Sequence, residues 1–226
     1  MPCALTYIAT KFDLDLTRRV PIEIPNTNRD TLARLFAQVG YLRGVEVGVE
    51  RGAYSEVLLR ENIGLTLTCV DAWTAFDGYR DHVRQGKLDR FYVETQQRLA
   101  PYKNRVQFVR KFSVDAAKDF ADGSLDFAYI DANHDFQSLT ADLAAWSPKV
   151  RAGGIIAGHD YSPHRWPNRI HVMQVIHGWT DAYDIRPWFV LGSKEKVPGQ
   201  LRDDARSWFW ISEPRPVVSQ KGPIRH

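Results

Sequence analysis

The sequence contains little cysteine and no long apolar run. Cys3 and Cys69 are its two cysteines, and Cys69 lies inside an apolar segment, so neither a disulfide framework nor a zinc cluster is expected. No apolar stretch approaches the roughly 20 residues of a membrane helix, and the N-terminus lacks the basic-then-apolar order of a signal peptide. We therefore expect a soluble, cytoplasmic protein without a membrane partner.

Blocks of like charge are also missing. The 30 basic and 27 acidic side chains are spread along the chain, and the formal net charge is +3. Runs of like charge and basic stripes are typical of chains that bind nucleic acids. We expect no nucleic-acid partner, and the sequence does not distinguish a monomer from a homo-oligomer.

The length of 226 residues favours one domain with short extensions. Residues 1–28 combine short apolar groups with Pro21 and Pro25 and have no sustained period, so we expect an N-terminal arm or a lid on the substrate side. Residues 213–226 carry proline and charge without a core-forming pattern, which predicts a mobile tail. The folded domain is therefore expected at 29–212.

Between these ends, helical and extended patterns alternate. The last two extended segments have no helical pattern between them long enough for a crossover, so they should pair antiparallel. This order predicts an α/β fold: a doubly wound, Rossmann-like, seven-stranded and mostly parallel sheet with an antiparallel C-terminal hairpin and helices on both faces. Helices are predicted at 28–40, 54–62, 89–102, 113–123, 136–148 and 170–183, and strands at 44–49, 65–73, 105–110, 125–131, 153–161, 186–192 and 206–212.

The carboxyl ends of the strands are where an open parallel sheet binds its ligands. The first predicted strand ends in a loop with Gly48 and Gly52, whose lack of side chains lets a ligand approach the backbone. The spacing G-x-x-x-G lacks the full dinucleotide fingerprint, and a tight strand-to-helix turn is an alternative explanation. Asp71 ends the second strand, 23 residues after Gly48 (71 − 48), where an acid can bind ribose hydroxyls or cap the next turn. Together these features favour a nucleoside ligand.

With these motifs in place, the chain resembles a class I S-adenosylmethionine-dependent methyltransferase of the small-molecule and sugar O-methyltransferase branch, which includes macrocin O-methyltransferase and cephalosporin-hydroxylase-like groups. The resemblance covers roughly residues 30 to 212. It rests on "VEVGVERG" after the first helix, "CVDAW" at the second strand, "DFAYIDANHDF" at the fourth and "GGIIAGHDY" at the fifth.

The resemblance implies S-adenosylmethionine as the cofactor, and it implies which part of the cofactor each motif contacts. For Glu46, a hydrogen bond to the N–H groups of a neighbouring loop is an equal alternative. The implied positions are Glu46 and Gly48 at the methionine moiety with Glu50 flanking it, Gly52 against the cofactor backbone, Asp71 at the ribose, Ala72 and Trp73 beside the adenine edge, Ser113 near the adenine, and Asp131 facing the sulfonium.

Methyl transfer to a hydroxyl needs positioning and removal of the acceptor's proton. His134, in the loop after Asp131, is the candidate base, because imidazole titrates near neutral pH; a loop histidine bonded to backbone is the alternative. Asp131, His159 and Asp160 stand at adjacent strand ends and form a candidate divalent-metal site. Related metal-dependent enzymes often have two acids where this chain has His159 and Asp160, which favours manganese, iron or zinc over magnesium, or no metal at all. The candidate catalytic residues are thus His134, Asp131 and His159.

The leading hypothesis is an S-adenosylmethionine-dependent O-methyltransferase that acts on a small molecule or a glycosyl group. A nicotinamide-dependent oxidoreductase on a similar sheet is one alternative; the missing fingerprint glycine and the C-terminal hairpin count against it. An N/D-P-P-Y motif or a basic stripe would favour a second alternative, a nucleic-acid methyltransferase, and the sequence contains neither. A cofactor-binding scaffold without catalysis is a third hypothesis, because fold analogy alone does not give function.

Overall fold

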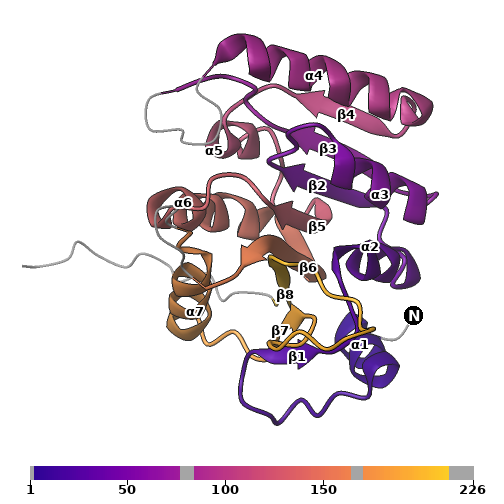
Figure 1. The fold of residues 1–226 in the computed structure, drawn as a ribbon, viewed down its shortest axis with the longest axis vertical. Helices are drawn as coiled ribbons and strands as arrows, with labels where there is room; N and C mark the ends of the chain where they lie inside the picture. Colours follow the sequence, from indigo (N-terminus) through magenta and orange to yellow (C-terminus); the bar gives the residue numbers. More distant parts are fainter. Residues whose placement is uncertain (1–2, 77–83, 164–169, 214–226) are drawn as a thin grey trace, which may run out of the picture.

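The computed structural model describes residues 3–76, 84–163 and 170–213 and shows one eight-stranded sheet with helices on both faces (Figure 1). The strands are β1 (Ile22–Ile24), β2 (Arg43–Val47), β3 (Thr66–Val70), β4 (Val106–Val109), β5 (Leu125–Ile130), β6 (Val150–Tyr161), β7 (Trp188–Leu191) and β8 (Arg206–Ile211). The α-helices are α1 (Ala4–Phe12), α2 (Arg29–Gln38), α3 (Ala53–Glu61), α4 (Gln85–Leu99), α5 (Ser113–Ala117), α6 (Phe136–Trp146) and α7 (Val172–Ala182), with 3₁₀ turns at Ala100–Tyr102 and Ser147–Lys149.

The strand order is β1-β7-β8-β6-β5-β2-β3-β4. β8 runs antiparallel to β6 and β7, and the other neighbouring pairs are parallel. The predicted mostly parallel sheet with an antiparallel C-terminal hairpin is confirmed. From β2 the chain builds outward to β3 and β4 and then returns to the other side of β2 as β5, so the strand order reverses between β2 and β5. A crevice at the carboxyl ends of these two strands is the expected ligand site.

The eighth strand is a difference from the predicted seven. β1 pairs parallel with β7 at the sheet edge, and α1 buries Ala4 and Ile8 against the same core as α2. β1 has only three residues, too few for a period-2 pattern to show in the sequence. The described residues before α2 therefore include elements of the fold itself. The boundary predicted at 28 and 29, and the role of a lid, stay predictions.

The two faces of the sheet carry separate apolar cores, because successive residues of a strand point to opposite faces. On one face, α1 to α4 cover Phe127, Tyr129 and Phe209. On the other, α5 to α7 cover Val45, Val47 and their neighbours, and Figure 1 shows these helices on the opposite side of the sheet from α1 and α2. Burial on both faces holds the strand ends in fixed positions.

Two predictions concern the ends of the chain and membranes. The expected mobile tail at 213–226 lies outside the described residues except for Glu213, and its mobility stays a prediction. Among the described residues, no helix combines the length and the apolar composition that a membrane crossing requires. The cytoplasmic location is not tested by the fold.

Candidate active site

Gly48 directly follows β2, where the backbone after β2 closely approaches the backbone after β5. Its φ is +89°, and a Cβ atom built there would lie 2.2 Å from the carbonyl oxygen of Asp131. An L side chain is both strained at this φ and excluded by backbone. The need for glycine at 48 therefore comes from the approach of β5 as well as from the cavity that Gly48 lines.

Gly52 has a different place from the one that the resemblance implies. It is the N-cap of α3 with φ +71°, and a Cβ atom there would lie 2.9 Å from Cγ2 of Thr95 on α4. Gly52 is not among the residues that line the cavity, whereas Arg51 and Ala53 on either side of it are. Its glycine serves the turn into α3 and the packing of α4, so its predicted contact with the cofactor backbone is not supported by this geometry.

Asp71, at the end of β3, holds the glycine loop in place. Its Oδ2 accepts hydrogen bonds from the backbone N–H groups of Val49 and Glu50, both at 3.0 Å, and its Oδ1 accepts one from the N–H of Trp73 at 2.8 Å. Burial raises the pKa of Asp71 above its usual range, although the three N–H groups act in the opposite direction. The bond to Trp73 is the capping of the next turn that the sequence offered as an alternative. Asp71 also lines the cavity, and its contact with a ribose stays a prediction.

Trp73 points away from the cavity and corrects its predicted place beside the adenine. The residue has a positive φ of 41°, its side chain is 1% exposed, and it packs against Tyr92 with ring centroids 4.8 Å apart. Its indole N–H donates to the carbonyl oxygen of Glu50 at 2.8 Å. The indole is part of the apolar core, and Ala72 and Thr74 line the cavity in its place.

Glu46 is a buried acid on β2 whose side chain faces the cavity. Its carboxylate accepts a hydrogen bond from the hydroxyl of Ser55 on α3, and its exposed fraction is 2%. Burial raises the pKa of Glu46 to about 8, although the Ser55 hydroxyl opposes this shift. At neutral pH the group is therefore mostly protonated in this structure. The alternative predicted for Glu46 was a hydrogen bond from the N–H groups of a neighbouring loop. The structure shows a bond from the Ser55 hydroxyl instead.

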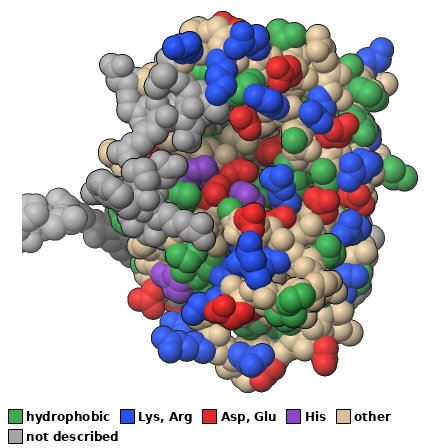
Figure 2. Space-filling model, viewed as in Figure 1, with side chains coloured by type: hydrophobic (Ala, Val, Ile, Leu, Met, Phe, Trp, Pro, Cys, Tyr) green, Lys and Arg blue, Asp and Glu red, His purple; other side chains and the backbone are tan. Residues whose placement is uncertain are grey.

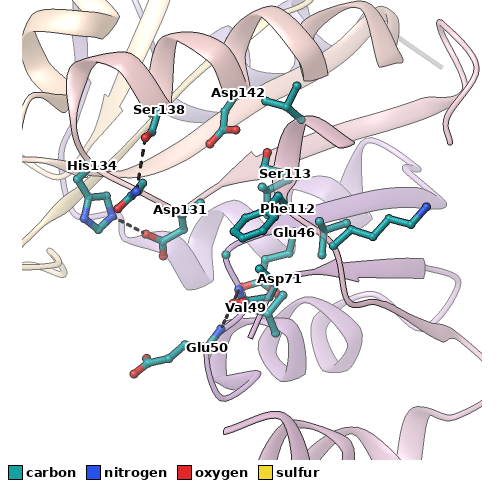
Figure 3. A pocket seen from close by; sticks show the side chains of 18 of the residues that line it. Glu46, Val49, Glu50, Asp71, Phe112, Ser113, Asp131, His134, Ser138 and Asp142 are labelled. Atoms are coloured by element: carbon teal, nitrogen blue, oxygen red, sulfur yellow. Dashed lines mark hydrogen bonds and ion pairs between the residues drawn. The ribbon is translucent and has the colours of Figure 1, made fainter. Parts of the chain in front are cut away.

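Gly48, Asp71 and Glu46 line a cavity of about 860 Å³ at the carboxyl ends of β2, β3, β4 and β5 (Figure 3). Its volume is in the range of small-molecule sites. Figure 3 shows the carboxylate of Asp131 inside this space, while the side chain of Glu50 extends away from Asp71. The predicted residues that line the cavity are Glu46, Gly48, Glu50, Asp71, Ala72, Ser113, Asp131 and His134.

At one edge of the cavity, three side chains bring nitrogen and oxygen donors together. Nε2 of His134 lies 3.0 Å from Oδ2 of Asp160 and 3.5 Å from Oδ1 of Asp131. One donor atom from each of Asp131, His134 and Asp160 lies within 4.8 Å of the other two. Figure 2 shows histidine and acidic side chains side by side in a hollow of this face. We call these three residues the Asp-His-Asp cluster.

His159 lies next to this cluster and was predicted as a member. Its Nδ1 lies 3.2 Å from Oδ2 of Asp160 and 3.8 Å from Oδ1 of Asp131, but the donor atoms that converge belong to His134 instead. Its Nε2 is buried and has no hydrogen-bond partner among the described residues. His134, predicted as the base, thus joins Asp131 and Asp160 in the converging donor set, and His159 lies beside it.

The two carboxylates change the protonation of both histidines. Burial lowers the pKa of His134, but the nearby carboxylates of Asp131 and Asp160 outweigh it and raise the pKa to about 10. The pKa of His159 is raised for the same reason, against burial. For Asp160, burial raises the pKa, and the contacts with His134 and His159 reverse the effect and lower it. The imidazole of His134 is therefore cationic at neutral pH in this arrangement.

A family model described as a methyltransferase domain matches residues 45–161, which is more than half of the 226 residues. The chain belongs to this methyltransferase family. The match runs from β2 to the end of β6, so it contains the glycine loop, Asp71 and the whole Asp-His-Asp cluster. The family supports the coarser expectation of a class I S-adenosylmethionine-dependent methyltransferase, and the O-methyltransferase branch stays a prediction.

One curated relative and several solved structures resemble the methyltransferase. The y4gI protein of Sinorhizobium fredii is 24% identical over 149 residues, which is 64% of this chain and 15% of that protein, so this chain spans a small part of that relative. A proposed caffeoyl-CoA O-methyltransferase of Staphylococcus aureus has a TM-score of 0.59 at 15% identity, with 92% of this chain and 90% of that chain covered. At such low identity the likeness shows the fold alone.

Two further solved structures carry names with other kinds of acceptor. The N-methyltransferase NodS of Bradyrhizobium japonicum has a TM-score of 0.53 at 15% identity and covers 82% of this chain and 95% of its own. The tRNA (m1A58) methyltransferase TrmI of Aquifex aeolicus has a TM-score of 0.54 at 14% identity, with 95% and 70% covered. The fold of the methyltransferase therefore does not determine its acceptor.

Several residues that line the cavity of the methyltransferase were not predicted. Arg29, the first residue of α2, places its guanidinium 5.3 Å from the centre of the Tyr54 ring. Burial lowers the pKa of Arg29, but neighbouring groups including Tyr129 and Asp131 outweigh it and raise the pKa. Phe112 and Asp142 also line the cavity. All three lie on helices or a loop whose pattern gave no signal beyond helix formation, because contact across the cavity depends on the tertiary fold.

Proposed function

We propose that the methyltransferase transfers a methyl group from S-adenosylmethionine to a hydroxyl group of a small molecule or a glycosyl group. The observation that carries the proposal is the Asp-His-Asp cluster at the edge of the 860 Å³ cavity. A hydroxyl must lose its proton to accept a methyl group, and a metal-binding or proton-binding cluster beside a cofactor cavity supplies that function.

The charge of the cavity is suited to this donor. S-adenosylmethionine carries a sulfonium and an ammonium, and Glu46, Asp71 and Asp131 line the cavity with carboxyl groups. The cofactor also carries a carboxylate, for which the guanidinium of Arg29 is the complementary partner in the lining. Carboxyl groups beside the guanidinium of Arg29 match a ligand that carries one carboxylate and two cationic groups. A pyrophosphate would instead favour an excess of positive groups and the full glycine fingerprint.

The donor set of the cluster fits a divalent cation. Two carboxylates and one imidazole are ligands for manganese, iron or zinc. Nε2 of His134 is buried and makes no hydrogen bond among the described residues, although two carboxylates lie near it. We assign Asp131, His134 and Asp160 as the residues that would hold the ion. When bound, a divalent cation lowers the pKa of a hydroxyl, which supplies the activation that the acceptor needs.

This assignment revises the role of His134 as a free base. A histidine whose pKa is raised to about 10 is protonated at neutral pH, and a protonated imidazole cannot accept a proton. We therefore infer that His134 is no free base: without an ion it carries a proton between Asp131 and Asp160, and as a metal ligand it would give that proton up. His159 orients Asp160 through the contact between Nδ1 and Oδ2.

Calorimetry with S-adenosylmethionine, S-adenosylhomocysteine and NAD tests the donor. Both sulfur compounds should bind and NAD should not; binding of NAD alone would establish the oxidoreductase alternative. Asp71→Ala should weaken binding by more than tenfold, because it removes the hydrogen bonds that hold Val49 and Glu50. Asp122→Ala is the control, since the Asp122 side chain is 72% exposed and pairs with Lys149.

Transfer of a radiolabelled methyl group tests the acceptor. Paired acceptors that differ only in a hydroxyl or an amine at one position should be offered, with sugars and phenols represented. Label on the hydroxyl member alone supports the proposal, and label on the amine member contradicts it. Binding of the donor without transfer to any acceptor would favour the non-catalytic scaffold. The expectations of no nucleic-acid partner and no membrane partner remain predictions, and the choice between a monomer and a homo-oligomer stays open.

A further inference from the structure

α7 has two histidines that no step of the proposed chemistry uses, and each contacts one of the segments that supply the Asp-His-Asp cluster. His171 is the N-cap of α7, and His177 lies within the helix. On the side of the cluster, His134 lies between β5 and α6, and Asp160 lies near the end of β6. Figure 1 shows α7 beside α6, and the two helices are in contact. α7 is therefore placed to affect both segments.

His171 binds the segment that carries His134 at two points. Its backbone N–H donates to the carbonyl oxygen of His134 at 2.8 Å, and its Nδ1 accepts the N–H of Phe136 at 3.0 Å. Only Asp135 lies between these two bonded residues. The backbone from which the His134 imidazole projects is thus fixed by a single residue of α7. Figure 3 shows that this imidazole is directed toward the carboxylate of Asp131.

The side chain of His171 does not serve its own helix. A polar N-cap side chain commonly accepts an N–H of the helix that it begins, but His171 makes no such bond within the described α7. Its φ of −101° and ψ of 10° also differ from the extended conformation of a capping residue. The imidazole instead accepts the first N–H of α6, while Asp135 accepts the next two, from Gln137 and Ser138. The contact therefore joins the N-termini of two helices.

The second contact holds α7 to the end of β6. Nε2 of His177 lies 2.7 Å from the hydroxyl oxygen of Tyr161, the residue after Asp160. Tyr161 is 3% exposed, and its ring meets that of Trp188 edge to face with centroids 5.8 Å apart, so its hydroxyl has a fixed position. α7 thus connects the two segments whose side chains meet at 3.0 Å, from Nε2 of His134 to Oδ2 of Asp160.

We propose that α7 sets the separation of His134 and Asp160, with His171 as the positioning residue that holds the backbone of His134. This deepens the proposed function and rests on it, since the cluster is the group that we assign to a metal ion. Ligands must be held within about 0.5 Å of their productive positions. The segment between β5 and α6 has no regular secondary structure of its own, so this precision has to come from a neighbouring element.

Calorimetry with Mn²⁺ alone, on the full chain, tests the role of His171. His171→Ala should weaken Mn²⁺ binding about tenfold or more, as is typical for groups that orient metal ligands. His171→Asn should retain most of the affinity, because its Oδ1 can accept the N–H of Phe136 from the place of Nδ1. His171→Gln, whose carbonyl oxygen lies one bond further out, should not. Gln174→Ala, at an exposed position on α7, is the control and should bind Mn²⁺ as the unmodified protein does.

The affinity for S-adenosylhomocysteine distinguishes positioning from general damage. His171 is not among the described residues that line the cavity, so all of these variants should bind this probe as the unmodified protein does. A parallel loss of both ligands in His171→Ala would overturn the positioning role. Equal Mn²⁺ affinities in His171→Ala and His171→Asn would overturn it as well, because the hydrogen bond to Nδ1 would then have no effect on the cluster.

Tyr161→Phe removes only the hydroxyl that contacts His177 and tests whether the two contacts of α7 act together. In the unmodified protein this change should weaken Mn²⁺ binding. In His171→Ala it should have a much smaller effect, because α7 is then already detached from the segment that carries His134. Additive effects of the two substitutions would show that the contacts act independently, and the proposed role of α7 would be wrong.

Crystal structures of metal-free His171→Ala and His171→Asn separate this proposal from the proposed function. The distance from Nε2 of His134 to Oδ2 of Asp160 should increase beyond 3.0 Å in His171→Ala and stay near this value in His171→Asn. An unchanged distance in His171→Ala would contradict the role of α7. If the unmodified protein binds no Mn²⁺, the metal in the proposed function is wrong, and these distances alone decide whether α7 sets the geometry of the cluster.

Discussion

Nε2 of His134 lies 3.0 Å from Oδ2 of Asp160, and this contact joins the loop after β5 to the end of β6. Asp131, at the end of β5, approaches the same nitrogen at 3.5 Å. One imidazole thus faces two carboxylates at the edge of the cofactor cavity. The arrangement suits either a cationic histidine or a metal ion, and the predictions below distinguish their contributions.

Asp160→Asn should lower the pKa of His134 by at least one unit, because it removes one of the two charges that raise it to about 10. Asparagine keeps the shape and tolerates the positive φ of 56° at this position. A raised histidine pKa contributes stability fully below the ordinary value of 6.5, and this contribution disappears as the pH rises through about 10. Asp160→Asn should therefore lose about 3 kcal/mol of stability at low pH, and less near pH 10.

NMR titration of the imidazole and denaturant unfolding at several pH values measure these two effects. Asp122→Asn is the control, because its exposed carboxylate pairs with Lys149 away from the cluster. An unchanged imidazole pKa in Asp160→Asn would contradict the charge pairing.

His134→Ala and His159→Ala form a matched pair that identifies the metal ligands. The sequence predicts Asp131, His159 and Asp160, whereas the structure brings together Asp131, His134 and Asp160. We expect His134→Ala to weaken binding of Mn²⁺ or Zn²⁺ by more than tenfold and His159→Ala to have a smaller effect. Calorimetry with each metal salt measures both. The opposite order would restore His159 as the ligand, and the absence of binding by the unmodified protein would remove the metal from the proposal.

Gly48→Ala should destabilise the protein by about 3 kcal/mol or more, because the new methyl group meets the backbone of Asp131 and the φ of +89° strains an L residue. Cofactor binding should fall with it. Gly178→Ala on α7 is the control: a Cβ atom there meets nothing within 4 Å, and alanine favours a helix by about 1 kcal/mol. Urea unfolding of both variants checks this contrast, and equal effects would refute the close approach of β2 and β5.

Glu46→Gln should remove a pH dependence from both stability and donor binding. The folded protein holds the proton of Glu46 up to about pH 8, whereas the unfolded chain releases it near 4.5. Rising pH between these values therefore favours unfolding, by about 1.4 kcal/mol for each unit. Glu46→Gln should gain relative stability over this range, as measured by unfolding at several pH values. Glu94→Gln, an exposed control, should not.

The same group should couple donor binding to proton release. A cationic ligand favours the ionised carboxylate, so the affinity for S-adenosylmethionine should rise as the pH approaches 8, and protons should be released on binding near neutral pH. Calorimetry in buffers of different ionisation enthalpy counts these protons. Proton release that persists in Glu46→Gln would assign the effect to another group.

Much of the fold was predictable because each element carries its own periodic pattern. The alternation of strands and helices gave the parallel sheet, and the missing crossover before β8 gave the antiparallel hairpin. The short β1 escaped prediction, since three residues have no recognisable period. Likewise, the positions of Asp71, Asp131 and Asp160 at strand ends followed from the order of the chain alone.

Side-chain direction and contacts across the cavity were not predictable in the same way. Trp73 lies two residues after Asp71, yet its indole is buried in the core. Asp142 and Arg29 lie outside the motifs in sequence and meet them only when the helices cover the sheet. No local pattern encodes these relationships.

By itself, the sequence determined the alternation of strands and helices, the glycine loop and the acids at the strand ends, because these depend on local periodicity and chain direction. Only the tertiary structure decided the order of the strands in the sheet, that His134 joins Asp131 and Asp160, and that Asp142 shares the cavity with Asp71. The physical reason is that these side chains come from separate elements, and their distances are set by how the helices pack on the two faces of the sheet.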